Sequence, residues 1–110
     1  AFNPPKIVFG KVNIKTTYWK YLNKGAINKI SFLAANTGGL PIRIQKAIVF
    51  TDSLSREIIV YKDIQPHTTI QIEGYTYIEL PLGVHKVTIE LLTPDNTVIG
   101  IYQTKVSIPK

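Results

Sequence analysis

Apolar and polar side chains alternate along most of this 110-residue chain with a period of two residues. The alternation is clear around Ile30, Phe32 and Ala34, which are separated by single residues of other character. A period of two is typical of a strand with one buried face, whereas an amphipathic helix repeats every 3.6 residues. The sequence therefore predicts a strand at 27–35 with these three side chains on one face.

A second strand is predicted at 42–51, after a turn at 36–41. The turn contains Gly38 and Gly39, which accept positive φ, and Pro41 stands where the next strand begins. We expect four apolar side chains to share one face of this strand: Ile42, Ile44, Ile48 and Phe50. These two strands and their turn are expected to organise the rest of the fold.

The first quarter of the chain predicts a strand at 6–15, in which Gly10 marks a bulge or a switch between sheets. We expect three of its apolar side chains to share a face: Val8, Val12 and Ile14. The segment 16–25 is predicted to be a loop. A continuation of the strand, or a single helical turn ended by Gly25, is the alternative.

The second half of the chain continues with short alternating segments. Strands are predicted at 56–61, 68–73, 75–80, 84–92 and 98–106. Gly74 is expected to separate two of them, and the last two form a hairpin around 93–97. The side chains expected to face the core from 84–92 are Val87, Ile89 and Leu91. Seven or eight strands without a sustained helical period predict an all-β sandwich of mostly antiparallel strands, with a small barrel as the alternative.

Length and composition fit a single domain that covers residues 1–110. The chain has no cysteine, so no disulfide or thiolate metal site is expected. Its apolar runs are far too short to span a bilayer. Methionine is absent and the chain begins with Ala1. We therefore expect a soluble part of a longer protein held by an N-terminal transmembrane anchor, with removal of the initiator methionine as the alternative.

Positive charge is concentrated at the start of the chain. The formal net charge is +6, and the first 29 residues contain six lysines and no acid. With interleaved aromatic residues these lysines form a candidate basic and aromatic patch: Lys11, Lys15, Tyr18, Trp19, Lys20 and Lys24. Such a patch suits an acidic protein, a membrane surface or single-stranded nucleic acid, and lysines also protect edge strands from aggregation. Nucleic acid is the least favoured, because only two basic residues are arginine.

The sequence contains no catalytic or metal-binding constellation. His67 and His85 have no neighbours at metal-ligand spacing, and both are expected to be exposed polar residues. No serine lies in a nucleophile-elbow context, and Gly38-Gly39 lacks the Lys-Ser/Thr pair of a phosphate-binding loop. Glu73 and Glu79 are expected to be solvated rather than paired as in glycosidases. We therefore expect a protein that is not an enzyme and has no cofactor or metal.

Two stretches resemble archaeal and bacterial surface immunoglobulin-like domains. They are Phe-Leu-Ala-Ala-Asn-Thr-Gly-Gly-Leu-Pro-Ile-Arg-Ile at 32–44 and Leu-Pro-Leu-Gly-Val-His-Lys-Val-Thr-Ile-Glu-Leu at 80–91. In such domains a strand ends in Asn-x-Gly, the next begins after a proline, and a Pro-x-Gly turn opens the penultimate strand. The resemblance covers 27–106. It extends to domains of the CARDB type, to the globular parts of pilin-like proteins and to the archaellum accessory (stator) proteins F and G.

This resemblance implies an immunoglobulin-like sandwich outside the cytoplasmic membrane, in the pseudo-periplasm of the cell envelope. It also implies a structural role in archaeal motility, in which the domain assembles through sheet edges with copies of itself, a paralogous archaellum subunit or the S-layer protein. A pilin-like or adhesion domain is the alternative within the same group.

From the strand patterns we expect an exposed apolar face that binds protein partners. Its candidate residues lie opposite the predicted core positions of their strands: Ile59, Tyr61, Tyr75, Tyr77, Ile99 and Ile101. Aromatic and β-branched side chains suit the centre of an interface, and addition of a strand at a sheet edge is a second mode of binding. A different hypothesis is a glycan- or nucleic-acid-binding module that uses Tyr18, Trp19 and the N-terminal lysines.

Overall fold

Strands make up almost all of the described chain. The computed structural model describes residues 7–109, where the one helical element is the short 3-10 turn η1 (Lys20–Leu22). The strands are β1 (Ile7–Trp19), β2 (Lys24–Asn36), β3 (Ile42–Thr51), β4 (Leu54–Ile64), β5 (Thr69–Pro81), β6 (Gly83–Leu92) and β7 (Val98–Ile108). The all-β prediction is confirmed. Within 7–109 no helix is long and apolar enough to cross a membrane.

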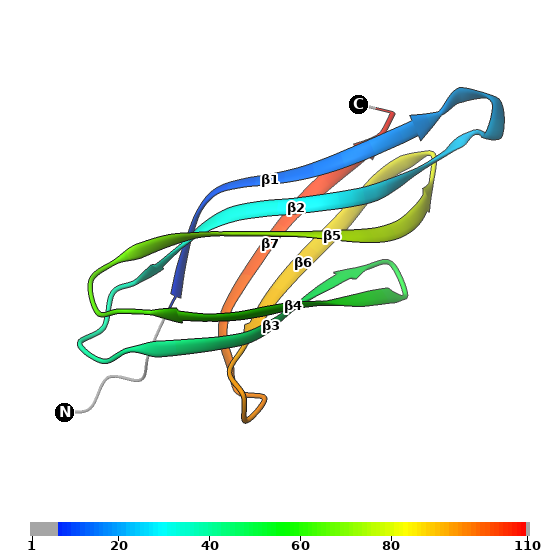
Figure 1. The fold of residues 1–110 in the computed structure, drawn as a ribbon. Coiled ribbons are helices and arrows are strands. Elements are labelled where there is room, and N and C mark those ends of the chain that lie inside the picture. Colours follow the sequence, from blue (N-terminus) through cyan, green and yellow to red (C-terminus); the bar gives the residue numbers. More distant parts are fainter. Residues whose placement is uncertain (1–6, 110) are drawn as a thin grey trace.

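The strands form two antiparallel sheets that pack face to face (Figure 1). One sheet has the order β1-β2-β5 and the other the order β4-β3-β6-β7. The chain makes hairpins at β1–β2, β3–β4 and β6–β7 and crosses between the sheets in its other three connections. This is the arrangement of an immunoglobulin-like β-sandwich. The predicted sandwich is confirmed, with seven strands.

The core between the sheets is almost entirely aliphatic. The two inward faces expected from the alternation are buried as predicted: Ile30, Phe32 and Ala34 on β2, and Val87, Ile89 and Leu91 on β6. Burial of an isoleucine or leucine side chain stabilises the fold by about 1.5–3 kcal/mol relative to exposure. The apolar residues of the period-two pattern therefore supply most of the buried surface that stabilises the fold.

A bulge in β3 reverses the faces of that strand halfway along. The pairing with β4 shifts register between Ile44 and Lys46, so Ala47 and Val49 are buried after the shift. Ile48 is consequently only half-buried and Phe50 is exposed. The expectation that both would lie on the same face as Ile42 and Ile44 was wrong, because one extra residue in a strand exchanges its two faces.

The predicted bulge near Gly10 is confirmed by a register shift between Gly10 and Asn13. Lys11 occupies this bulge with a φ of 47°. On one side of it Ile7 is buried and Val8 is exposed, and beyond it Val12 and Ile14 pack against the core. The expectation that Val8 shares their face was wrong, since the bulge lies between them.

Two predicted interruptions are parts of regular elements. The segment 16–25 is not a loop: β1 continues to Trp19, the helical turn η1 follows, and β2 starts at Lys24. The strand continuation and the helical turn that were the alternatives therefore both occur, one after the other. Gly74 lies inside β5 and does not divide it. A Cβ at Gly74 would lie 2.4 Å from Cγ2 of Ile58 on β4, so glycine is required there by close packing.

Asn36 fixes the turn at which the chain leaves the first sheet for the second. Its side chain is buried, and Nδ2 donates to the carbonyl oxygens of Leu40 (2.8 Å) and Ile64 (3.0 Å). Its Oδ1 accepts from the backbone N–H of Gly38 at 2.9 Å. One amide thus satisfies three backbone groups, a role that the sequence pattern does not reveal. The turn held by these hydrogen bonds connects β2 of the three-stranded sheet to β3 of the four-stranded sheet.

Candidate protein-binding surface

The sandwich has two places where the edge of one sheet faces the edge of the other. At the first, the closed seam, β4 lies against β5. Side chains fill this seam: Ile58 packs onto Gly74, and Lys62 Nζ donates to the carbonyl oxygen of Gln71 at 3.2 Å. The strand predicted at 56–61 extends to Ile64, so β4 is long enough to cover its neighbour.

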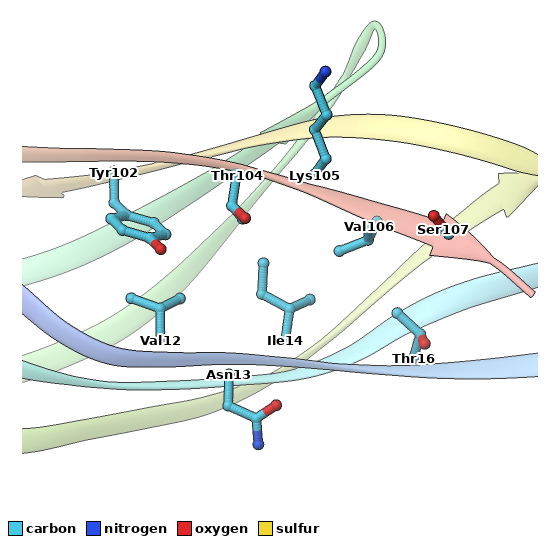
Figure 2. A pocket seen from close by; sticks show the side chains of 9 residues that line it. All are labelled: Val12, Asn13, Ile14, Thr16, Tyr102, Thr104, Lys105, Val106 and Ser107. Atoms are coloured by element: carbon cyan, nitrogen blue, oxygen red, sulfur yellow. The ribbon is translucent and has the colours of Figure 1, made fainter. Parts of the chain in front are cut away.

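At the second, the open seam, β1 lies against β7 (Figure 1). The two strands are in close contact at one end, where a Cβ at Gly100 would lie 3.1 Å from the ring of Phe9. Beyond Tyr102 they enclose a groove of about 380 Å³. Val12 and Ile14 point into it from β1, and Tyr102, Thr104 and Val106 point toward them from β7, whereas Lys105 points away (Figure 2). No backbone hydrogen bond joins the two strands within 7–109.

Five of the six apolar residues predicted to bind partners are exposed, but they are shared between the two sheets. Their locations are Ile59 and Tyr61 on β4, Tyr75 and Tyr77 on β5, and Ile101 on β7. Ile59 lies on the outer face of the four-stranded sheet, because its neighbours Ile58 and Val60 pack against the core. Tyr75 lies on the outer face of the other sheet, with Lys29 Nζ 5.4 Å from its ring centroid. These residues therefore do not form one flat face.

Ile99 is not exposed as expected but belongs to the core, with 8% of its surface exposed. The pairing of β6 with β7 shifts register between Leu91 and Leu92, opposite this residue. The bulge places Ile99 inward and leaves Ile101 outward, although the two are separated by a single residue.

The predicted basic and aromatic patch is divided by the end of β1. Lys11 and Lys15 lie along the strand, Tyr18 is partly exposed near its end, and Lys20 lies in η1. Trp19 is tilted against Tyr77, with 6.2 Å between ring centroids. This contact places Trp19 of the basic and aromatic patch beside Tyr77 of the predicted partner-binding set, on the outer face of the three-stranded sheet.

Glu79 ties Lys24 and Tyr77 together on this face. Oε1 of Glu79 accepts from the Tyr77 hydroxyl at 2.8 Å and from Lys24 Nζ at 3.3 Å. These hydrogen bonds hold the pKa of the Glu79 carboxyl below its usual range, and the same bond raises the pKa of the Tyr77 phenol. Of the four lysines of the predicted patch, Lys24 is thus paired with an acid of the same domain.

His85 is buried, contrary to the expectation that it is an exposed polar residue. Its Nδ1 lies 3.0 Å from Oδ2 of Asp52, and its Nε2 lies 2.8 Å from the carbonyl oxygen of Pro81. Both ring nitrogens are engaged, so neither is available to activate a nucleophile. Nor does the part of the chain in the structure contain a group of three or more acidic or histidine side chains that could hold a metal.

Comparison with known proteins identifies the fold. No family model matches the chain, and no curated protein matches it. Among solved structures, a chain of the archaellum periplasmic stator protein complex FlaF and FlaG from Sulfolobus acidocaldarius is similar, with a TM-score of 0.52 and 17% identity. The match covers 86% of this chain and 88% of the other. The class of protein is therefore an immunoglobulin-like sandwich, and the stator chain shares its fold over nearly the whole domain.

Proposed function

We propose that this chain is a non-enzymatic structural module of the cell envelope that binds other proteins, and that it acts in the stator of an archaellum. The observation that carries the proposal is the fold shared with a chain of the FlaF and FlaG stator complex over 86% of the sequence. Exposed apolar side chains support it further: Tyr61 is of a type enriched at interfaces, and Ile59 and Ile101 suit their apolar centres. The expected partners are a paralogous stator subunit and the S-layer protein, outside the cytoplasmic membrane.

Sedimentation velocity tests this function. The purified domain is run at low and high salt, alone and with the paralogous stator subunit or S-layer protein from the same cells. A complex that persists at high salt is expected, because apolar burial is not screened by ions. Ile59→Lys and Ile101→Lys should weaken it, and Leu54→Lys, an exposed position outside the predicted set, serves as the control. A domain that ignores both partners at every salt concentration would contradict the proposal.

A second candidate function is glycan binding at the contact between Trp19 and Tyr77. Adjacent aromatic rings on an exposed face, with Lys24 and Glu79 beside them, offer stacking surfaces and hydrogen-bonding groups to a sugar. Titration with envelope oligosaccharides, followed by tryptophan fluorescence, tests this function. Trp19→Ala should abolish binding but leave the protein complexes intact.

A further inference from the structure

The open seam presents two free strand edges to the same groove. β1 is paired only with β2 and β7 only with β6, so each has one edge without a strand partner in the described chain. Alternate backbone N–H and C=O groups of an edge strand point outward and are available for pairing. The groove thus lies between two rows of such groups.

The two strands run in the same direction. Phe9 of β1 packs beside Gly100 and Tyr102 of β7, and 12–16 then faces 102–107 along the groove. Figure 1 shows both arrows pointing to the same end of the molecule. A single inserted strand can therefore pair with both in the antiparallel manner, which is the commoner type and extends each sheet.

The groove has closed ends and a length that suits a short strand. Phe9 fills one end against Gly100. At the other end Ile108 leans under β2, where a Cβ at Gly25 would lie 2.8 Å from Cγ2 of Ile108. The six residues of 102–107 span about 20 Å at 3.3 Å per residue. The space between the ends therefore accepts a segment of about six residues.

The floor of the groove is the edge of the hydrophobic core. Val12, Ile14 and Val106 pack against the core but are only half-buried. Thr16 and Thr104 contribute hydroxyl groups and methyl groups beside them, and Figure 2 shows Thr104 on the same side of β7 as Tyr102. An inserted strand with β-branched side chains at alternate positions would complete the burial of these residues.

The two strands that border the groove carry lysines that form no ion pair within the described residues. Lys15 on β1 is directly opposite Lys29, and Lys105 on β7 is directly opposite Lys86. Like charges placed opposite one another are unfavourable in a sheet. Neither Lys15 nor Lys105 takes part in an ion pair within 7–109, whereas Lys29 pairs with Glu73. β1 and β7 contain no acidic residue.

We propose that the open seam binds an extended segment of a partner protein as an added strand, antiparallel to β1 and β7. The segment has β-branched apolar residues that face the groove floor and alternate with acidic residues that lie between Lys15 and Lys105. A second copy of this chain is a poor occupant, because its net charge of +6 repels a like copy. The inference rests on the proposed protein-binding function and names the site and the chemistry of the partner.

The test uses a fluorescent peptide of about six residues in which glutamate and valine alternate, matched to the length of the groove. Hydrogen exchange should slow at backbone amides of both 13–17 and 103–107 when the peptide binds. Protection of only one of these segments, or of neither, would overturn the inference. A peptide of the same charge in which proline replaces valine should not bind, because proline cannot donate to a ladder.

Two pairs of charge reversals separate local recognition from attraction by net charge. Lys15→Glu with Lys105→Glu should weaken peptide binding about tenfold, since two attractive cross-strand pairs become repulsive. Lys20→Glu with Arg56→Glu changes the net charge equally but lies outside the groove, and should alter binding by less than about twofold. Equal weakening by both pairs would overturn the inference in favour of non-specific attraction.

A groove-filling variant connects the site to the proposed function. Val106→Trp should abolish peptide binding, and it should also abolish the complex with the stator or S-layer partner if that partner supplies the strand. A partner complex that survives both Val106→Trp and the Lys15/Lys105 reversals would overturn the inference while leaving the protein-binding function intact. Concentration-dependent dimers that Val106→Trp abolishes would instead identify a second copy as the occupant and overturn the partner assignment.

Discussion

The two seams of this sandwich differ in how far side chains cover the exposed edges of the strands. At the closed seam, Ile58 packs onto Gly74 and Lys62 caps the carbonyl oxygen of Gln71, so side chains take the place of strand pairing. At the open seam, close contact is limited to the Phe9–Gly100 end and a groove follows it. An edge that is filled by side chains contributes to stability, whereas an edge left accessible can bind another strand. The difference is that the closed seam is filled by side chains, whereas the open seam leaves a groove that the proposed strand would occupy.

The charged residues also differ between the strands of the two seams. β4 and β5 together hold Glu57, Asp63, Glu73 and Glu79, and each of these acids forms an ion pair with a lysine or arginine. The only charged residues of β1 and β7 are lysines. Of the lysines in the first quarter of the sequence, Lys11 and Lys15 therefore lie on the open seam, whereas Lys24 and Lys29 are paired with acids of β5.

Among substitutions at the two seams, the largest expected effect is that of Gly74→Val at the closed seam. A Cβ there would lie 2.4 Å from Ile58 Cγ2, so β4 and β5 must separate, and we expect a loss of about 3 kcal/mol in the free energy of unfolding. Urea denaturation measures the loss. Gly39→Ala is the control, because nothing lies within 4 Å of a Cβ at that position. If Gly74→Val were as mild as the control, the close packing of this seam would be disproved.

Asn36→Ala should cost about 2 kcal/mol, since it leaves the carbonyls of Leu40 and Ile64 and the amide of Gly38 without their side-chain partner. Ile64 ends β4, so the loss loosens the end of the closed seam. Chemical denaturation of this variant beside the exposed Thr37→Ala gives the comparison. Similar midpoints for the two variants would mean that water replaces the amide without cost.

At the open seam, Ile14→Ala should cost only about 1 kcal/mol, because the side chain is half-buried and borders a groove. Ile89→Ala removes an equal volume from the centre of the core and should cost about 3–4 kcal/mol. Thermal or urea unfolding of the pair measures the difference. Equal losses would show that the core is as tightly packed at this edge as at its centre.

How far the sequence predicts this architecture depends on the regularity of each strand. β2 and β6 keep their alternation over the predicted inward faces, and their buried residues were identified correctly. β3 and β7 contain bulges, and one extra residue exchanged the expected sides of Ile48 and Ile99. In β3 a warning was present, because Lys46 occupied a position on the supposed apolar face.

The seams were beyond sequence reasoning for a different reason. Edge strands differ from central strands only in what lies beside them, and pairing order is a property of the whole fold. The lysines of the first quarter pointed to an edge or a partner, but Lys105 borders the groove from a strand about 90 residues away. The pairing of His85 with Asp52 was missed likewise, because 33 residues separate them.

The smallest expected effect is the part of the pH dependence that comes from the Arg43–Asp63 pair on β3 and β4. Arg43 donates two hydrogen bonds to Asp63 (2.7 and 3.0 Å), which lower the pKa of that carboxyl below its usual range. A carboxyl with a depressed pKa in the folded state stabilises the fold above its unfolded pKa, and this contribution is lost as pH falls through the folded value. The melting temperature should therefore decline from about pH 4 downward. Arg43→Gln should make the decline shallower, whereas Lys105→Gln on the open seam should leave the slope unchanged because Lys105 pairs with no carboxylate in the described chain. An equal change of slope in both variants would show that the effect of Arg43→Gln comes from net charge rather than from the Arg43–Asp63 pair.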